Sequence, residues 1–206
     1  AVLYRKQARF KLITTGKINQ KNLLFEEQHL ERLEKASRYF SYPFDAEDLR
    51  QKIEEECQAC DVNQDYRLRI ILSKSGEMEL SRQILTPLSP IFCQAKLCLQ
   101  KADLQQAFTY FKTTHRPHLS LGKQEIIYHN AAGELLETSI GNLVLKIAGK
   151  LYTPPIRLGI LAGIYRQHLL ERGQVEEKVL TLKDLAQAEA IYGCNAVREM
   201  YELEVI

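Results

Sequence analysis

The most regular pattern in the chain runs from residue 26 to residue 40. Leu30, Leu33, Ser37 and Phe40 recur there at steps of three and four, which predicts a helix with one buried face. Alternating segments typical of strands precede and follow it, at 10–18 and 67–73. A helix of this kind buries its apolar face against a sheet, so the sequence predicts an α/β or α+β fold.

Turn and capping residues divide the rest of the chain into short elements. Gly16 predicts a turn between the first two strands, and Asp45, with Asp48 three residues on, predicts the N-cap of a second helix. Thr181 and Asp184 predict the same kind of cap for a short helix. The other predicted elements are strands at 23–25, 67–73, 93–99, 126–129, 142–147, 150–152, 175–180, 188–192 and 201–206, and helices at 45–60, 118–123 and 159–173.

The predicted elements fall into two groups. Residues 103–110 change from polar to aromatic, and we place a boundary there. The sequence therefore predicts a smaller α/β subdomain at 1–106 and a larger one at 107–206.

Bulk composition excludes several classes of protein. The 206 residues are 45% hydrophobic and 26% charged, which is ordinary for a soluble globular protein. A net charge of +2 is too small an excess of positive charge to indicate binding to nucleic acid or to an anionic membrane. No apolar run is long enough to cross a bilayer, and the N-terminus lacks the layout of a signal peptide. We expect a cytoplasmic protein with neither nucleic-acid nor membrane partners. The chain begins at Ala1 and not at methionine, as after processing or excision from a longer protein.

The five cysteines give little sign of a metal site. Cys57 and Cys60 have the spacing of a metal knuckle, but no second pair at zinc-ligand spacing follows. We expect reduced thiols and no bound metal, as is usual in the cytoplasm.

The stretch 110–116 is the first candidate for chemistry. Lys112 follows two aromatic residues and precedes Thr113, Thr114 and Arg116. An amine that is partly desolvated or near another cation loses its proton more easily and becomes a nucleophile. Its natural chemistry is a Schiff base with a carbonyl substrate or with pyridoxal phosphate. The alternative is a surface lysine whose stem lies on apolar neighbours.

Pyridoxal phosphate needs a lysine, a site for its phosphate and a charge partner for its pyridine nitrogen. Lys112 meets the first need. The glycine-rich stretch 159–165 at a helix start offers N–H groups to a phosphate, and Arg32 adds a guanidinium. Glu137 supplies an acid between a turn and a strand. Each candidate has an alternative interpretation. Arg32 also fits a solvated charge on a helix, Glu137 a strand-edge residue, and the glycines ordinary turn residues.

Taken in order, these segments resemble the fold-type-IV pyridoxal-phosphate enzymes, the class-IV aminotransferase family. Within it they are most similar to the aminodeoxychorismate lyases and to the lyase-like domain of fused aminobenzoate synthases. The residues that carry the resemblance are His29, Leu30, Glu31, Arg32 and Leu33; Lys112, Thr113, Thr114 and Arg116; Gly133, Glu134, Glu137, Ser139, Asn142 and Leu143; 151–155; 159–163 with Arg166; and 180–182, 184–185, 187–191, Asn195 and Ala196.

The resemblance implies roles for particular residues, with pyridoxal 5'-phosphate lying between the two subdomains of a homodimeric enzyme. It implies Lys112 as the residue that bonds the cofactor aldehyde, Arg32 as a phosphate ligand and Glu137 as the partner of the pyridine nitrogen. The N–H groups of Ile164 and Tyr165, together with Asn195, would also bind the phosphate. Arg69, Thr15 with its neighbour Thr14, and Arg116 are the candidates on the side of the small-molecule substrate.

The chain also departs from the family pattern, mostly on the substrate side. Leu119 and Ser120 replace an aromatic residue and an acid, Cys194 replaces a glycine, and Tyr165 replaces a hydroxyl residue or methionine. The resemblance implies a lyase that releases pyruvate and 4-aminobenzoate from 4-amino-4-deoxychorismate. The alternatives are transamination of branched-chain or D-amino acids and a catalytically idle dimeric scaffold. The scaffold has no need of Lys112, Arg32 and Glu137 together.

Overall fold

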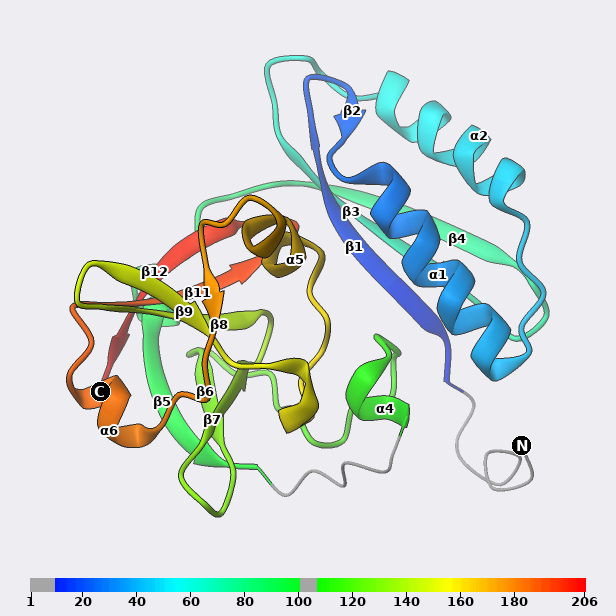
Figure 1. Ribbon diagram of the computed structural model, residues 1–206. Helices are drawn as coiled ribbons and strands as arrows, with labels where there is room; N and C mark the ends of the chain where they lie inside the picture. The colour runs from blue at the N-terminus through cyan, green and yellow to red at the C-terminus, as the bar shows by residue number, and fades with distance from the viewer. Residues whose placement is uncertain (1–9, 101–106) are drawn as a thin grey trace. The chain divides into compact units, whose positions relative to one another are not determined.

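A computed structural model describes residues 10–100 and 107–206, which form two compact units (Figure 1). Unit 1 comprises Ala1–Thr86 and Phe111–Arg116, and unit 2 comprises Pro87–Tyr110 and Pro117–Ile206. These units differ from the expected subdomains 1–106 and 107–206. The chain passes to unit 2 at Pro87, and Phe111–Arg116 returns to unit 1 because it bonds to the first strand. The expected boundary at Gln106 itself lies outside the described residues.

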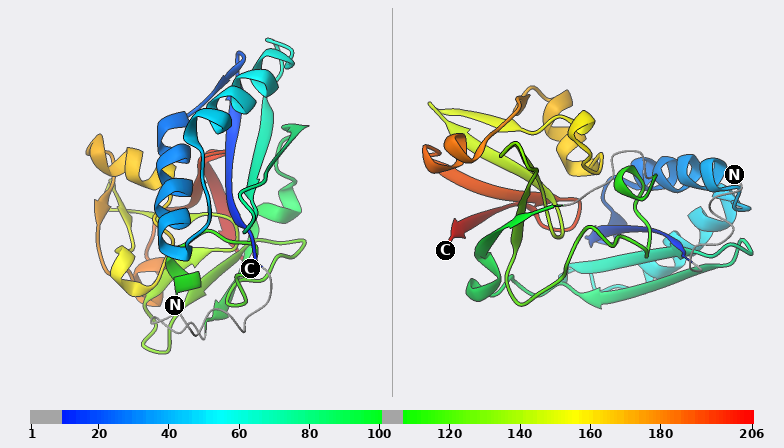
Figure 2. Two further views of the ribbon diagram at one scale, coloured as in Figure 1. Left: turned by 90° about the vertical axis from the view of Figure 1, so that its right-hand side faces the viewer. Right: turned by 90° about the horizontal axis from the view of Figure 1, so that it is seen from below.

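Unit 1 is a four-stranded sheet with two helices on one face, as two views show (Figures 1 and 2). Its strands lie in the order β2-β1-β3-β4, and all neighbours are antiparallel. The elements are β1 (Leu12–Asn19), β2 (Asn22–Leu23), α1 (Glu26–Phe40), α2 (Ala46–Gln58), β3 (Tyr66–Leu72) and β4 (Met78–Ile84).

The predicted helix at 26–40 is confirmed as α1, and its buried side chains include Leu30 and Leu33. The cap at Asp45 is also confirmed, since its Oδ1 accepts hydrogen bonds from the N–H groups of Glu47 and Asp48. Alternate residues of β1 and β3 face these helices and are buried. One face of the sheet is thus packed, and the other is left for polar side chains.

Gly16 does not form the predicted turn, because β1 runs through it unbroken. A Cβ at Gly16 would lie only 2.5 Å from His29 Nε2, so glycine here makes room for a helix side chain. The chain turns instead at Gln20 and Lys21, which adopt φ values of 47° and 60°.

Unit 2 is built on an eight-stranded sheet in the order β10-β9-β8-β11-β12-β5-β6-β7. Strand β7 also pairs with β8, so the strands from β8 to β7 close into a ring. The elements of this unit are α3 (Pro90–Cys93), β5 (Gln94–Leu99), α4 (Ala107–Tyr110), β6 (Ile126–His129), β7 (Leu135–Thr138), β8 (Asn142–Ile147), β9 (Lys150–Thr153), η2 (Ile156–Leu158), α5 (Ile164–Glu171), β10 (Glu176–Glu177), α6 (Leu182–Ala186), β11 (Ala190–Asn195) and β12 (Glu199–Val205).

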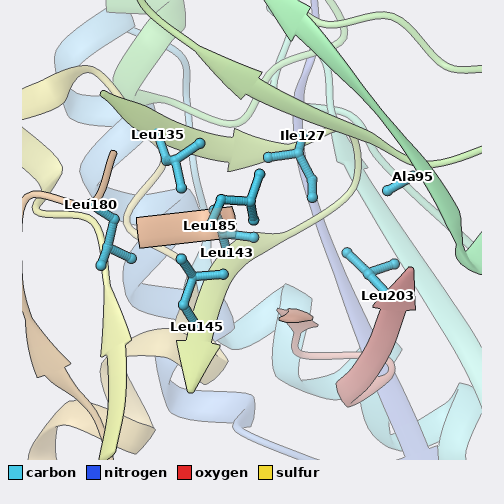
Figure 3. Packing of buried hydrophobic residues seen from close by; sticks show 8 residues of the cluster. All are labelled: Ala95, Ile127, Leu135, Leu143, Leu145, Leu180, Leu185 and Leu203. Atoms are coloured by element: carbon cyan, nitrogen blue, oxygen red, sulfur yellow. The ribbon is translucent and has the colours of Figure 1, made fainter. Parts of the chain in front are cut away.

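Aliphatic side chains from five of these strands and from the region of α6 converge in one cluster (Figure 3). The cluster consists of Ala95, Ile127, Leu135, Leu143, Leu145, Leu180, Leu185 and Leu203. On the opposite side of β8, Val144 packs in a second cluster with Leu169 and Cys194. Because both faces of β8 are buried, the residues at its start are held firmly in place.

Three predicted elements of unit 2 need correction. The stretch 118–123 is not helical, and Ser120 N donates a hydrogen bond to Tyr128 Oη there. The helix predicted at 159–173 begins only at Ile164, because Gly159 turns the chain with a φ of 85°. The strand predicted at 175–180 is limited to Glu176–Glu177. The capping box of Thr181 and Asp184 is confirmed. Among the described residues, no helix is long and apolar enough to cross a membrane.

Candidate active site

Lys112 lies on a short segment that adds to the edge of β1. Its carbonyl oxygen accepts a hydrogen bond of 3.1 Å from Ile13 N, and Thr114 N donates to Lys11 O at 2.9 Å. The hydroxyl of Thr114 accepts from Lys11 N, while that of Thr113 donates to His115 O. The two threonines after the lysine therefore fix the backbone that carries it.

Aromatic packing anchors the same segment on the end of α1. The ring centroid of Phe111 lies 4.7 Å from that of Tyr39 and 5.3 Å from that of Phe40. Phe10 packs edge-on to Phe40 at 4.9 Å. The backbone of Lys112 is thus held between the edge of β1 and an aromatic cluster on α1. Both contacts come from residues that are far from Lys112 in the sequence.

The charge state of Lys112 is the most distinctive electrostatic feature of unit 1. Burial, and after it the nearby positive charges of Arg32, Arg116, Arg69 and Arg67 in that order, together lower the pKa of its amine to about 7. An amine with this pKa is largely neutral just above neutral pH and can act as a nucleophile or a base. Unit 1 therefore brings together Lys112, Arg32, Arg69 and Arg116 as the sequence predicts.

Arg67 belongs to the same group of cations, and the sequence reasoning missed it. The signal was present in the alternation of Arg67, Leu68, Arg69 and Ile70, which places both arginines on one face of β3. Thr15 stands opposite Arg69 in the register of β1 and β3 and lies on that face as well.

Thr14 lies on the other face of the sheet, under α1. Its Oγ1 lies 2.6 Å from His29 Nδ1, and both side chains are buried. Burial, with the charges of Arg32 and Lys112, holds the pKa of His29 well below its ordinary value, so this histidine is neutral. Of the two threonines predicted on the substrate side, only Thr15 shares a face with Arg69.

In unit 2, Glu137 and its neighbour across the sheet both form hydrogen bonds to the backbone of Leu161. It is 2% exposed, and its Oε2 accepts a hydrogen bond from Leu161 N at 3.4 Å. Opposite it in the β7–β8 register, Asn142 donates from Nδ2 to Leu161 O at 2.8 Å. A Cβ at Gly163 would overlap Asn142 Oδ1. Glu137 and Asn142 thus set the path of the chain into α5.

The predicted phosphate groups lie at the start of α5 and the end of β11. Helix α5 begins at Ile164 and Tyr165, and its N-cap Gly163 offers no side chain to the N–H groups of the first turn. Asn195 Oδ1 accepts hydrogen bonds from the N–H groups of Val197 and Arg198, and its Nδ2 donates to Ile140 O at 3.2 Å. The Asn195 amide carries two hydrogens, and this contact uses one of them.

Comparison with known proteins decides the family. The family model described as amino-transferase class IV matches residues 11–206. The chain belongs to the class IV aminotransferase family.

Two yeast proteins with similar sequences are named as aminodeoxychorismate lyases. A Schizosaccharomyces pombe protein, provisionally named an aminodeoxychorismate lyase, is 25% identical over 187 residues, which cover 84% of this chain and 80% of that protein. The Saccharomyces cerevisiae aminodeoxychorismate lyase is 25% identical over 185 residues, which cover 64% of this chain and 49% of the yeast protein. The chain thus matches about half of the length of the yeast lyase.

Solved structures of the class IV aminotransferase family share the fold. A Mesorhizobium loti protein, provisionally named an amino-acid aminotransferase, has 25% sequence identity and a TM-score of 0.83, with 96% of this chain and 100% of that chain covered. A Mycobacterium tuberculosis protein described as a hypothetical aminotransferase in its PLP-bound form has 20% identity and a TM-score of 0.76, with 95% and 80% covered.

One buried polar cluster of this class IV chain was not foreseen. Glu125 is 0% exposed, and it accepts hydrogen bonds from Ser139 N at 2.9 Å, from Tyr201 Oη at 2.9 Å and from Ser139 Oγ. These contacts hold the turn 138–141, whose Ile140 carbonyl accepts from Asn195. Burial and the charge of Glu125 hold the pKa of Tyr201 well above its ordinary value. In sequence, Glu125 ends a polar run and is typical of a surface residue.

A surface groove of about 660 Å³ in unit 2 lies apart from these residues. It is lined by Pro90, Cys93, Gln94, 188–191 and 202–205, which include none of the predicted site residues. The five cysteines are free thiols, and burial raises the pKa of Cys57 to about 11 and that of Cys194 to about 12. Thiols with such pKa values are poor nucleophiles near neutral pH.

Proposed function

We propose that the protein is a pyridoxal-phosphate-dependent lyase that cleaves 4-amino-4-deoxychorismate to pyruvate and 4-aminobenzoate. The observation that carries this proposal is the group of cations around Lys112 in unit 1. The proposed substrate has two carboxylates and the cofactor has a phosphate, so the reaction needs several cationic groups close to one lysine. The names of the yeast relatives agree with this substrate.

The residues present fit pyridoxal 5'-phosphate. Lys112 has an amine with a pKa of about 7, which suits it to bond the cofactor aldehyde. The family resemblance supports Arg32 as a phosphate ligand, and it supports the N–H groups of Ile164 and Tyr165 and the side chain of Asn195 in the same role. The buried carboxylate of Glu137 would keep the pyridine nitrogen protonated.

When bound, the cofactor supplies an electron sink joined to the amine of the substrate. The chain then has three tasks. Arg69 and Arg116 orient the substrate through its carboxylates, and Thr15 lies beside Arg69 to assist them. Lys112 Nζ, freed when the substrate amine takes its place, would take the proton from the ring carbon as general base. The bond from the ring carbon to the enolpyruvyl oxygen would break as the ring becomes aromatic, and the released enolpyruvate would gain a proton to become pyruvate. Because the aromatic product cannot return, no second substrate is needed.

Transamination of branched-chain or D-amino acids is the second candidate, and the likeness to the Mesorhizobium loti protein favours it. In that reaction Lys112 Nζ moves a proton between two carbons, and a keto acid must accept the amino group in a second half-reaction. A site for branched-chain substrates needs one cationic group for one carboxylate. The additional arginines near Lys112 are the reason that we place the lyase first.

We also propose a cytoplasmic homodimer. The family resemblance supports the dimer, and the free cysteines support a reducing compartment. Light scattering after size-exclusion chromatography tests the assembly, and a monomer at micromolar concentration contradicts it.

The deciding experiment uses the purified chain loaded with pyridoxal phosphate. Borohydride is expected to fix the cofactor to the peptide that contains Lys112. We then expect 4-amino-4-deoxychorismate to yield 4-aminobenzoate and pyruvate without an added amino acceptor, while branched-chain and D-amino acids leave the visible spectrum unchanged. If those amino acids bleach the spectrum rapidly and 4-amino-4-deoxychorismate is inert, the enzyme is the transaminase.

A further inference from the structure

The face of the unit 1 sheet opposite α1 and α2 carries a row of cations. Lys17 of β1 stands opposite Arg67 of β3, and Thr15 stands opposite Arg69. Arg67 and Arg69 are two residues apart on one strand, so they project from the same face about 7 Å apart. Leu68 between them is buried on the opposite face.

The two arginines on this face lack acidic partners. Arg67 Nη2 donates to Gln83 Oε1 at 3.1 Å, and Arg69 Nε is buried without a hydrogen-bond partner. Within residues 10–100 and 107–206, no ion pair involves either arginine, whereas Lys17 pairs with Asp65 at 3.2 Å and Arg82 pairs with Glu56. The cost of a charge that is partly buried without a carboxylate falls on Arg69, and Arg67 beside it is exposed, so an anion from outside the chain that binds between them would offset that cost.

We infer that Arg67 and Arg69 together bind the second carboxylate of a dicarboxylate substrate, and that Arg67 determines specificity for dicarboxylates over monocarboxylates. This inference rests on the proposed function, because it assumes that the cofactor phosphate engages Arg32 and that the first carboxylate engages Arg116. It names the substrate class of that same site through a residue that the family resemblance does not single out.

Three properties suit Arg67 to this role. Its bond to Gln83 on the neighbouring strand orients the planar guanidinium, which can bind a carboxylate through two parallel hydrogen bonds. It is exposed, so a substrate reaches it without rearrangement of the core. It is also near enough to Lys112 to lower the pKa of that amine, so an anion at Arg67 lies within the field of the reacting group.

The test measures binding, so it does not depend on turnover. The full chain, loaded with pyridoxal phosphate, is titrated by calorimetry with isophthalate, a rigid aromatic dicarboxylate, and with benzoate, its monocarboxylate counterpart. The variants are Arg67→Gln, Arg67→Lys and, as a matched control, Arg82→Gln. Arg82 stands opposite Leu68 on the helix-covered face of the sheet, where it pairs with Glu56.

Arg67→Gln is expected to weaken isophthalate binding about 10- to 100-fold, the usual range for a lost hydrogen bond to a charged group, and to leave benzoate binding within about twofold. Arg82→Gln is expected to change neither. If Arg67→Gln is found by circular dichroism to be unfolded, Arg67→Lys decides, with a smaller loss that is still confined to isophthalate.

The inference is overturned if the parent chain binds isophthalate no better than benzoate, or if both Arg67 variants weaken the two ligands equally or not at all. It is separable from the proposed reaction. If Arg67 distinguishes isophthalate from benzoate but the chain does not convert 4-amino-4-deoxychorismate, the dicarboxylate subsite is supported and the proposed reaction is contradicted. A chain that takes up no cofactor is titrated alone in phosphate buffer, with the same variants and the same criteria.

Discussion

The two units hold their candidate groups in opposite ways. In unit 1 the groups are long side chains, Lys112 and the surrounding arginines, and the lysine segment is held by hydrogen bonds to β1 and by the packing of Phe111 on α1. In unit 2 the groups are backbone N–H groups at the start of α5 and a buried carboxylate, Glu137, whose position depends on close packing at Gly163. Substitutions in unit 1 should therefore change chemistry while the fold persists. Substitutions in unit 2 should change chemistry and stability together.

The largest expected effect comes from Lys112→Ala, which removes the nucleophile and base. Borohydride fixation is expected to be lost entirely, and turnover to fall about 10⁴-fold, the upper range for a lost general acid or base. Lys11→Ala is the control, because Lys11 lies on the adjoining backbone but forms an exposed ion pair with Glu79. Fixation at another lysine in the Lys112 variant contradicts the assignment.

Glu137→Gln is expected to lower turnover about 100-fold with the cofactor still bound, since a neutral amide cannot hold the pyridine proton. The absorption spectrum reports cofactor occupancy, and product formation reports the rate. Glu134→Gln, in the turn before β7, is the matched control. Unchanged turnover in Glu137→Gln removes that residue from the role.

Arg32→Ala tests whether a unit 1 cation acts only on binding. The phosphate is a remote handle, so the variant is expected to raise the Kd for pyridoxal phosphate about 10- to 100-fold while turnover of the loaded enzyme changes less. A fluorescence titration measures the first quantity. Parent-like affinity would mean that Arg32 does not bind the phosphate.

Gly163→Ala tests the backbone dependence of unit 2. The added Cβ would overlap Asn142 Oδ1, so the variant is expected to lose about 1–3 kcal/mol of unfolding free energy, as overpacking usually costs, together with cofactor affinity. Gly122→Ala is the control, because its Cβ would meet only ordinary contacts at 3.6 Å. Urea unfolding of both variants gives the comparison, and equal stability would break the contrast between the units.

A further expected effect is a pH dependence of the unfolding free energy of the cofactor-free chain. The folded pKa of Lys112 is about 7 against an ordinary value of 10.5, so between these values the unfolded chain binds the extra proton. The penalty on folding is complete below about pH 7 and is relieved as pH rises toward 10.5, so stability rises across that window. Lys112→Met is expected to remove this rise in urea unfolding at a series of pH values. A parallel profile in both proteins contradicts the lowered pKa.

The sequence predicted those features that depend on residues near one another in the chain. The periodicity of α1 and the caps at Asp45 and Thr181 are local, and the structure has them where expected. The return of Phe111–Arg116 to unit 1 was not predictable, because it depends on bonds to β1 far back in sequence.

The candidate site also has residues that sequence motifs identify and residues that they do not. The resemblance named Lys112, Arg32 and Glu137 from ordered motifs, and these roles stay predictions until they are tested. Arg67 was missed although its alternation with Leu68 was visible, because no motif contains it. Glu125 was missed for a different reason. Its burial depends on Tyr201, a partner that is remote in sequence.

The contact between Tyr201 and two glycines has a consequence for how the chain can vary. Tyr201 stands opposite Gly193 in the β11–β12 register, and a Cβ at Gly193 would overlap its ring. A Cβ at Gly141 would come within 3.2 Å of the Tyr201 hydroxyl, but it would meet the backbone carbonyl oxygen of Cys194 first, at 2.5 Å. Positions 193 and 201 are therefore epistatic. An alanine at position 193 can be accommodated only after the ring at 201 has become smaller, and a smaller residue at 201 leaves Glu125 without one of its donors. A chain that replaces Tyr201 first therefore has a weakened 138–141 turn, whose Ile140 carbonyl binds Asn195. We expect the pair of Gly193 and Tyr201 to be replaced rarely in evolution for this reason.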